Sequence, residues 1–276
     1  MATTRLASHT TSSRSNSSCL SSSPRYSDVK LYSFWASSSA WRTRIALNAK
    51  DIPHTIIPVN LRENEQRTKE FLAVNPMGQV PVLTYKDNTV MPADRDDGDV
   101  PVELWTQSAA MIEFIDEVLA PDGPPLIPRN DPIMRIAARE MVDLIVSGIQ
   151  PLQSGSMIRN LEAASEGKII ATEYANAAIT KGLTALQQMM ERHKSRMKRL
   201  QQHGVVDVTG PYSVGSSSPT IVDICLVPQL YNARLYGVDV ESDFPELAEI
   251  DKLCSVHPWF VPAHADVHKE LESGRK

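Results

Sequence analysis

The spacing of hydrophobic and polar positions changes along the chain and divides it into four segments. Residues 1–27 are rich in serine and threonine and show no regular apolar spacing, which is typical of a disordered tail. Short apolar runs alternate with amphipathic stretches over 28–119, and a proline-rich linker occupies 120–129. Apolar residues recur at helical spacing over 130–276, so the pattern predicts a mixed domain followed by a helical domain.

The segment 28–119 alternates strand-like and helix-like stretches. We expect strands at 29–34, 55–59, 79–84 and 102–105, and helices at 41–50, 63–74 and 107–118. Pro58 favours an edge position for the second strand, because proline donates no hydrogen bond to a neighbouring strand. This order predicts an α/β domain in which helices cover the faces of a sheet.

The segment 130–276 predicts an all-α bundle. Two stretches carry apolar residues at helical spacing: Ile133, Ala137, Met141, Leu144, Ile145 and Gly148 in the first, and Tyr174, Ala178, Leu183, Leu186 and Met190 in the second. Thr220 and Asp223 form a capping-box pattern, with aspartate in place of the usual glutamate or glutamine. That pattern predicts the start of a helix that carries Ile224 and Leu226.

Composition and charge exclude several classes of protein. With 42% hydrophobic and 22% charged residues among 276, the chain is neither fully disordered nor fibrous. A net charge of −5 leaves no basic field for a nucleic-acid backbone, and no apolar run is long enough to cross a membrane. The three cysteines are too few for a disulfide framework or a cysteine-based zinc site. We therefore expect no metal and a reducing compartment, the cytoplasm.

The N-terminal tail has a second interpretation. It carries three arginines and no acidic residue before Asp28, and a basic, hydroxyl-rich composition is also typical of an organelle transit peptide. Mitochondrial targeting therefore stays open beside the plain disordered tail. We interpret the acidic stretch 91–99 as a solvated loop, because it lacks the regular spacing of calcium ligands.

Three consecutive serines, Ser37, Ser38 and Ser39, stand directly before the helix expected at 41–50. A helix N-terminus carries unpaired N–H groups and a partial positive charge, so it favours an anion. A hydroxyl at that end can also donate to a thiolate, and the two effects together can lower a thiol pKa from its usual value of about 8.5 by about one to two units. Taken alone, the serines are more simply explained as helix caps.

Five stretches of the chain occur in an informative order. They are Leu31–Leu47 (LYSFWASSSAWRTRIAL), Asn75–Leu83 (NPMGQVPVL), Gln107–Ser108 with Ile112–Glu113, Asp143–Gln153, and Asp223–Gln229. Together they resemble the zeta class of glutathione transferases, the maleylacetoacetate isomerases, over roughly 29–260. The resemblance implies a thioredoxin-like domain at 28–119, an all-α substrate domain at 130–276, glutathione as cofactor and a homodimer. It also implies a place in tyrosine and phenylalanine catabolism.

The resemblance assigns roles to individual residues. It implies that Ser37 and Ser38 are catalytic, as donors to the glutathione thiolate. It implies that the backbone of Val80, before a cis proline, pairs with the cysteinyl part of glutathione, and that Gln107 and Ser108 hold the γ-glutamyl carboxylate. The full set of implied glutathione-binding residues is Ser37, Ser38, Ser39, Arg42, Gln66, Val80, Gln107, Ser108, Gln150, Ser154 and Ser156.

The substrate half of the implied site departs from the family pattern. The arginines expected to hold substrate carboxylates are Arg42, Arg44 and Arg234, but Arg234 stands one position before the family's arginine. Ala36 replaces a usual arginine, and Ser39 replaces a usual cysteine. Three functions therefore remain open. They are cis–trans isomerisation of maleylacetoacetate or a related unsaturated diketo acid, glutathione-dependent conversion of another electrophile, and a non-catalytic binding role.

Overall fold

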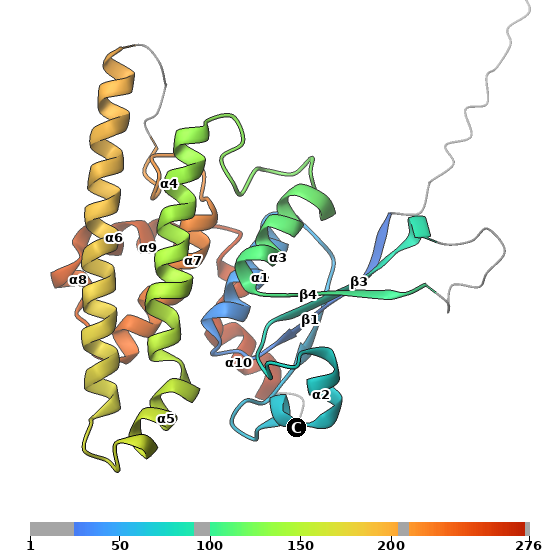
Figure 1. Ribbon diagram of the computed structural model, residues 1–276. Helices are drawn as coiled ribbons and strands as arrows, with labels where there is room; N and C mark the ends of the chain where they lie inside the picture. Colours follow the sequence, from blue (N-terminus) through green and yellow to red (C-terminus); the bar gives the residue numbers. More distant parts are fainter. Residues whose placement is uncertain (1–24, 91–99, 204–209, 274–276) are drawn as a thin grey trace, which may run out of the picture.

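The computed structural model describes residues 25–90, 100–203 and 210–273. The acidic stretch 91–99 and all but the last three residues of the expected N-terminal tail lie outside these ranges. Figure 1 shows a sheet-containing domain beside a bundle of helices, with the C-terminal helix returning to the sheet domain.

A four-stranded mixed sheet forms the centre of the N-terminal domain. The elements described there are β1 (Tyr26–Ser33), α1 (Ser38–Ala49), β2 (Thr55–Pro58), α2 (Lys69–Val74), β3 (Val82–Asp87), β4 (Val102–Thr106) and α3 (Ser108–Phe114). The strand order is β2-β1-β3-β4, with β1 parallel to β2 and β3 antiparallel to both β1 and β4. This confirms the predicted thioredoxin-like domain, and Pro58 lies in an edge strand as expected.

Several boundaries of this domain differ from the sequence prediction. The strand expected at 79–84 is β3, which begins only after Pro81, because proline has no backbone N–H to pair with a neighbouring strand. The helix expected at 41–50 begins at Ser38, because Ser37 caps it.

Two further differences in this domain also have a local reason. β1 begins at Tyr26, inside the stretch assigned to the tail, because Tyr26 pairs with Asp87 and packs edge-on against Tyr85. The helix expected at 63–74 is divided into a 3-10 turn and α2, because the Thr68 side chain caps the start of α2.

The C-terminal domain is helical, as predicted. Its described helices are α4 (Pro132–Asp143), α5 (Gly155–Ala164), α6 (Ala171–Gln202), α7 (Ile221–Leu235), α8 (Val240–Asp243), α9 (Pro245–Ser255) and α10 (Ala265–Ser273). A π-helical turn at Leu144–Ile149 and a 3-10 turn at Gln150–Gln153 connect α4 to α5. The capping box predicted at the start of α7 is present, with Asp223 accepting from the Thr220 backbone N–H at 2.7 Å.

Two hydrophobic clusters hold the elements together. The larger cluster runs through both domains, and α1 contributes Trp41, Ile45 and Leu47 to it. The smaller cluster consists of Phe34, Ala40, Val59, Phe71, Val80 and Val82. Because this smaller cluster includes residues from the start of α1 and from the loop before β3, it fixes these two segments beside each other.

The linker at 120–129 contains no helix or strand, as expected, but a buried carboxylate anchors it. The chain continues from α3 through a π-helical turn at Ile115–Leu119, which carries Asp116. The Asp116 carboxylate lies 2.6 Å from the Lys50 ammonium at the end of α1, and both side chains are fully buried. This ion pair joins the linker end of the N-terminal domain to α1.

Candidate active site

Ser37 is the N-cap of α1 and follows the end of β1. Its backbone is extended (φ −76°, ψ 112°), and its Oγ accepts a hydrogen bond from the Ala40 N–H at 3.2 Å. The Ser37 N–H donates to the Phe34 carbonyl at 3.0 Å, which holds the serine in a tight turn. Because the oxygen accepts from within the helix, the hydroxyl proton can be donated to a group beyond the helix end.

Ser38 is the first residue of α1 and is nearly enclosed. The residue is only 3% exposed, and its Oγ has no hydrogen-bond partner within the described part of the chain. Leaving a buried hydroxyl without a partner costs about 1–3 kcal/mol, so this group fits a ligand atom that accepts a hydrogen bond. Ser39, about 100° further around the helix, is half-buried.

The loop before β3 presents the backbone of Val80. The Val80–Pro81 peptide bond is cis, as predicted. Asn75 braces this loop: its Nδ2 donates to the Gln79 carbonyl at 2.7 Å, and its Oδ1 accepts from the Met77 N–H at 3.1 Å. Asn75 was not among the residues expected at the site, although its place at the start of the NPMGQVPVL motif was the available signal.

Gln66 lies in the 3-10 turn before α2, packed against the same loop. It is buried, and its Oε1 has no partner within the described residues. Gly78 has φ +61°, and a Cβ there would stand 2.9 Å from the Gln66 carbonyl oxygen. A glycine is therefore required for this close approach, which places Gln66 beside the segment that carries Val80.

The start of α3 joins the start of α1. Gln107, the N-cap of α3, has φ +71°, a backbone conformation that non-glycine residues seldom adopt and that is enriched at functional sites. Ser108 follows as the first residue of α3, and its Oγ accepts from Arg42 Nη1 at 3.3 Å. Since Ser38 and Arg42 are one turn apart on α1, this bond brings the serine end of α1 to Gln107 and Ser108.

Arg42 was expected to contact glutathione and substrate, but its side chain lies inside the protein. The residue is 1% exposed, and neither its Nε nor its Nη2 has a partner among the described residues. Burial lowers the pKa of this guanidinium from its ordinary value. A side chain enclosed in this way acts on a ligand through Ser108 rather than by direct contact with a substrate.

The other two arginines expected to hold substrate are engaged within the protein. Arg44 is buried and donates to Ser33 Oγ at 2.9 Å and to three backbone carbonyls. Arg234 forms ion pairs with Glu241 at 2.7 Å and Asp251 at 2.8 Å. Both guanidinium groups therefore already have protein acceptors. Arg44 is enclosed, whereas the Arg234 side chain is 34% exposed and lines the second cavity described below, so its role in substrate binding stays a prediction.

The expected site residues of the helical domain cluster where α4 leads into α5. Gln150 opens the 3-10 turn, and Ser154 caps α5 by accepting from the Met157 N–H at 3.3 Å. Ser154 Oγ also lies 3.3 Å from Ser156 Oγ. These contacts explain the two serines as parts of a helix start, and a role in binding glutathione stays a prediction.

A buried amide pair close to this turn was not anticipated. The side chains of Gln153 and Gln229 exchange two hydrogen bonds of 3.0 and 2.9 Å inside the protein. The Tyr236 hydroxyl donates to the Gln153 carbonyl at 2.9 Å. Residues 153 and 229 lie far apart in sequence, so only the packing of α7 against the turn reveals the pair.

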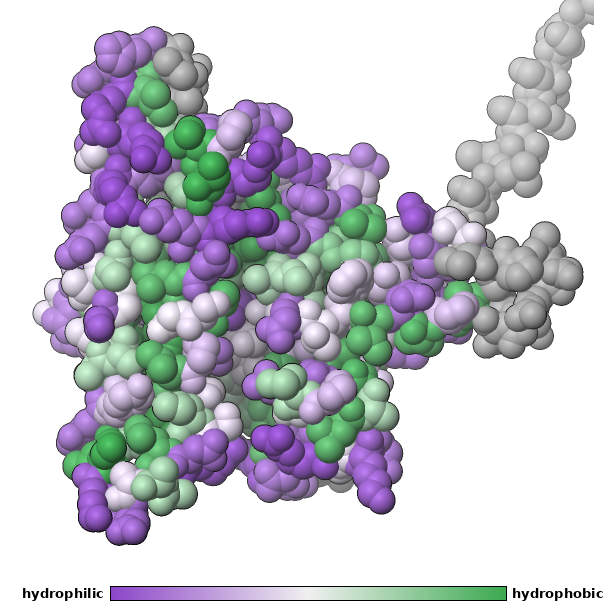
Figure 2. Space-filling view, in the orientation of Figure 1, coloured by the Kyte–Doolittle hydropathy of each residue, from purple (hydrophilic) through white to green (hydrophobic). Residues whose placement is uncertain are grey.

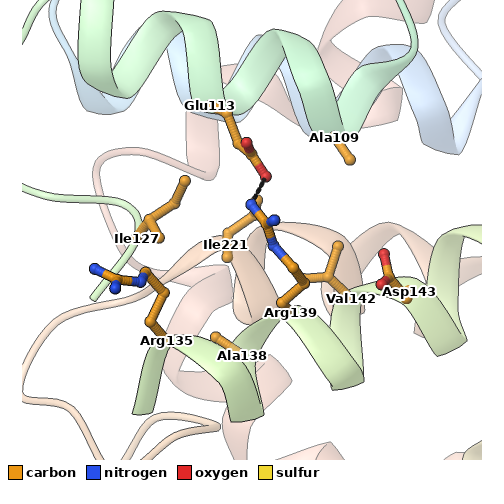
Figure 3. A pocket seen from close by; sticks show the side chains of 9 residues that line it. All are labelled: Ala109, Glu113, Ile127, Arg135, Ala138, Arg139, Val142, Asp143 and Ile221. Carbon is orange, nitrogen blue, oxygen red and sulfur yellow. Dashed lines mark hydrogen bonds and ion pairs between the residues drawn. The ribbon is translucent and has the colours of Figure 1, made fainter. Parts of the chain in front are cut away.

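Two cavities lie away from the serines. The first, of about 210 Å³, lies between α3 and α4, and Figure 3 shows the Arg139 guanidinium reaching Glu113 across it. The second, of about 280 Å³, is lined largely by apolar and aromatic side chains of both domains, among them Trp41 and Tyr231. Neither cavity is lined by the serines at the start of α1.

Within 25–90, 100–203 and 210–273, no group of three histidine, cysteine, aspartate or glutamate residues could hold a metal ion. No helix in these ranges is both long and apolar enough to span a bilayer.

Comparison with known proteins shows which proteins this chain resembles. Residues 36–118 match the model of the glutathione S-transferase N-terminal domain. The chain is 34% identical to the probable maleylacetoacetate isomerase 2 of Drosophila melanogaster, over 86% of this chain and 89% of that protein. It is also 34% identical to the maleylacetoacetate isomerase of Mus musculus, over 80% of this chain and 85% of that protein.

Solved structures give the same result. The maleylacetoacetate isomerase of Anaeromyxobacter dehalogenans, solved with glutathione in its active site, superposes with a TM-score of 0.68 at 34% identity. That match covers 87% of this chain and 96% of the other. A maleylpyruvate isomerase described as a bacterial zeta-class glutathione transferase superposes with a TM-score of 0.69 at 28% identity, covering 86% of this chain and 97% of the other.

Proposed function

Because this chain belongs to the maleylacetoacetate isomerase family of zeta-class glutathione transferases, we propose that it isomerises maleylacetoacetate or a related unsaturated diketo acid with glutathione as cofactor. The observation that carries the proposal is the pair of hydroxyls at the start of α1. Ser37 can donate beyond the helix end, and Ser38 Oγ is buried without a partner in the part of the chain that the structure describes. Both properties suit a thiolate acceptor.

The residues at the site fit glutathione chemically. Glutathione supplies a thiol nucleophile for reversible addition to a cis double bond. The protein's part is to hold the sulfur at the start of α1, where the helix dipole and the Ser37 and Ser38 hydroxyls favour the charged form. We assign the cysteinyl backbone to Val80, the glycyl end to Gln66 and the γ-glutamyl end to Gln107 and Ser108. Ser38 Oγ and Gln66 Oε1, which find no partner among the described residues, support this assignment.

The function is tested by turnover and by the thiol pKa together. Purified protein with glutathione should convert maleylacetoacetate to its trans isomer. Ser37→Ala and Ser38→Ala should each lower the rate and raise the pKa of bound glutathione by about one unit, because each removes a donor worth about 1.5 kcal/mol to the thiolate. The pKa is read from the ultraviolet absorbance of the thiolate.

Ser39→Ala is the matched control in the same stretch and should change both quantities less. An unaltered thiol pKa in both the Ser37 and the Ser38 variants would contradict the assignment of these hydroxyls.

The hydrogen bonds and ion pairs of the arginines within the protein favour a second function. Arg44 and Arg234 donate to protein acceptors, and Ala36 carries no charge. A dicarboxylate substrate needs cations, so these contacts favour a different electrophile for the same glutathione site. Glutathione binding without turnover of maleylacetoacetate, together with conjugation of aryl halides or α-halo acids, would establish this alternative.

We also propose that the protein is a homodimer in the cytoplasm. β4 is an edge strand whose Leu104 and Trp105 are both 44% exposed, and Ile136 on α4 is 64% exposed. Figure 2 shows hydrophobic surface over β4 and along part of α4. An exposed apolar edge strand and an exposed apolar helix face can both be buried by contact with a second copy of this chain. The cytoplasmic assignment is supported by two buried free cysteines, Cys225 and Cys254.

We expect sedimentation at micromolar concentration to give twice the chain mass of 30.5 kDa. Ile136→Asp should shift the protein towards the monomer, because it introduces a charge into the apolar contact. Val256→Asp is the control, since Val256 is 77% exposed at the end of α9 and belongs to neither β4 nor α4. A monomer for the unmodified chain, or equal effects of the two variants, would count against the dimer.

A further inference from the structure

Arg42 carries a buried charge that the described residues leave uncompensated. Among the described residues its hydrogen-bond partner is Ser108 Oγ, at 3.3 Å, and its Nε and Nη2 have none there. No described carboxylate lies within ion-pair distance of it, unlike the buried Lys50, which is paired with Asp116. The ionisable group acting on it is Cys225, whose pKa burial raises to about 11, so that this thiol stays neutral at pH 7.

A buried cation without a counter-charge is costly, and a protein retains one only where something else compensates it. Arg42 itself is only 1% exposed, so its guanidinium is enclosed in the protein rather than open to a ligand. Ser108 is the group through which its charge can act.

The Ser108 hydroxyl is oriented by this contact. Its oxygen accepts from Arg42, so its own proton must be directed elsewhere, away from the guanidinium. A hydroxyl that accepts from a cation becomes a stronger donor, because the two hydrogen bonds polarise each other. Ser108 also begins α3, next to Gln107 with its left-handed backbone.

We propose that Arg42 is a positioning residue, which directs and polarises the Ser108 hydroxyl towards a ligand carboxylate and takes that carboxylate as its missing counter-charge. The inference rests on the proposed glutathione site, where the carboxylate is that of the γ-glutamyl group. Arg42 thus selects for this carboxylate without touching it. Carboxylate binding also relieves the cost of the buried charge, so the ligand stabilises the fold more than its surface contacts alone would.

The test compares glutathione with γ-aminobutyryl-cysteinylglycine, which lacks only the γ-glutamyl α-carboxylate. Calorimetry on the full chain gives the ratio of the two affinities. We expect the unmodified protein to prefer glutathione, Arg42→Met to lose about ten- to a hundredfold of that preference, and Arg42→Lys to keep part of it because the charge remains. Binding of the shorter peptide should change little in any of the three proteins.

Two further variants, with Arg139→Met as their control, keep the test decisive if Arg42→Met fails to fold. Ser108→Ala should reduce the preference as Arg42→Met does, and combining it with Arg42→Lys should cost nothing beyond Ser108→Ala. Arg139→Met removes an exposed arginine on α4 and should leave the preference unchanged. The proposal that Arg42 acts through Ser108 would be overturned by either of two results. One is that the double variant loses the sum of the two single losses of preference for glutathione, and the other is that Ser108→Ala keeps the full preference. If the unmodified chain binds neither peptide, the proposed glutathione site fails, which is a separate outcome.

Discussion

Asp116→Asn is expected to lower the free energy of unfolding by about 3–5 kcal/mol, because it leaves a buried lysine without its counter-charge. Lys50 Nζ lies 2.6 Å from Asp116 Oδ1, and neither side chain is exposed. The same carboxylate accepts from the backbone N–H groups of Leu126 and Ile127 at 3.0 and 3.2 Å. In the asparagine variant, the side-chain NH₂ group would face one of these backbone N–H groups, and two donors cannot bond each other. The substitution therefore disturbs the linker as well as the ion pair.

Urea unfolding, followed by tryptophan fluorescence and circular dichroism, measures this effect. Arg129→Ala is the matched control: Arg129 reaches the same carboxylate at 3.1 Å, but its side chain is 37% exposed, and its loss should cost about 1 kcal/mol or less. Adding Lys50→Met to Asp116→Asn should restore part of the stability, because no buried charge is then left without a partner. Arg129 also loses this carboxylate, but its side chain is 37% exposed. Equal losses for the Arg129 and Asp116 variants would show that the buried ion pair is not what stabilises this junction.

Asp223→Ala is expected to be the second severe change, at about 3 kcal/mol, because one buried carboxylate satisfies two neighbouring residues. Asp223 Oδ1 accepts from the N–H and the hydroxyl of Ser213, at 2.9 and 2.7 Å. Its Oδ2 accepts from the N–H and the hydroxyl of Thr220, at 2.7 and 3.0 Å. Burial raises the pKa of this carboxyl although all four donors oppose the rise.

Ser213→Ala is the control for this prediction, because it removes one hydroxyl donor and leaves the other three in place. We expect it to cost about 1 kcal/mol in the same urea experiment. If Asp223→Ala lowers the free energy of unfolding no more than Ser213→Ala, the carboxylate does not hold the start of α7 in place, and the capping box contributes little to the stability of the whole protein.

The candidate site was partly predictable from sequence, since its helix starts have local signals. Ser37 before an apolar helix, and Thr220 with Asp223 three residues later, are patterns that depend on neighbours along the chain. The cis bond at Val80–Pro81 was anticipated through family resemblance rather than from spacing. The roles of the arginines were not predictable, because Arg42 and Arg44 look alike in sequence and differ in which partners fold against them.

The sequence by itself determined the order of strands and helices, the edge position of β2 and the division into two domains, because hydrophobic periodicity and capping act over a few residues. Tertiary structure decided which charges are buried and what they meet. Ser108 accepts a hydrogen bond from Arg42, 66 residues earlier in the chain, and Asp116 forms an ion pair with Lys50, also 66 residues earlier. Such pairs depend on how α1 packs against α3, and no local pattern encodes that contact.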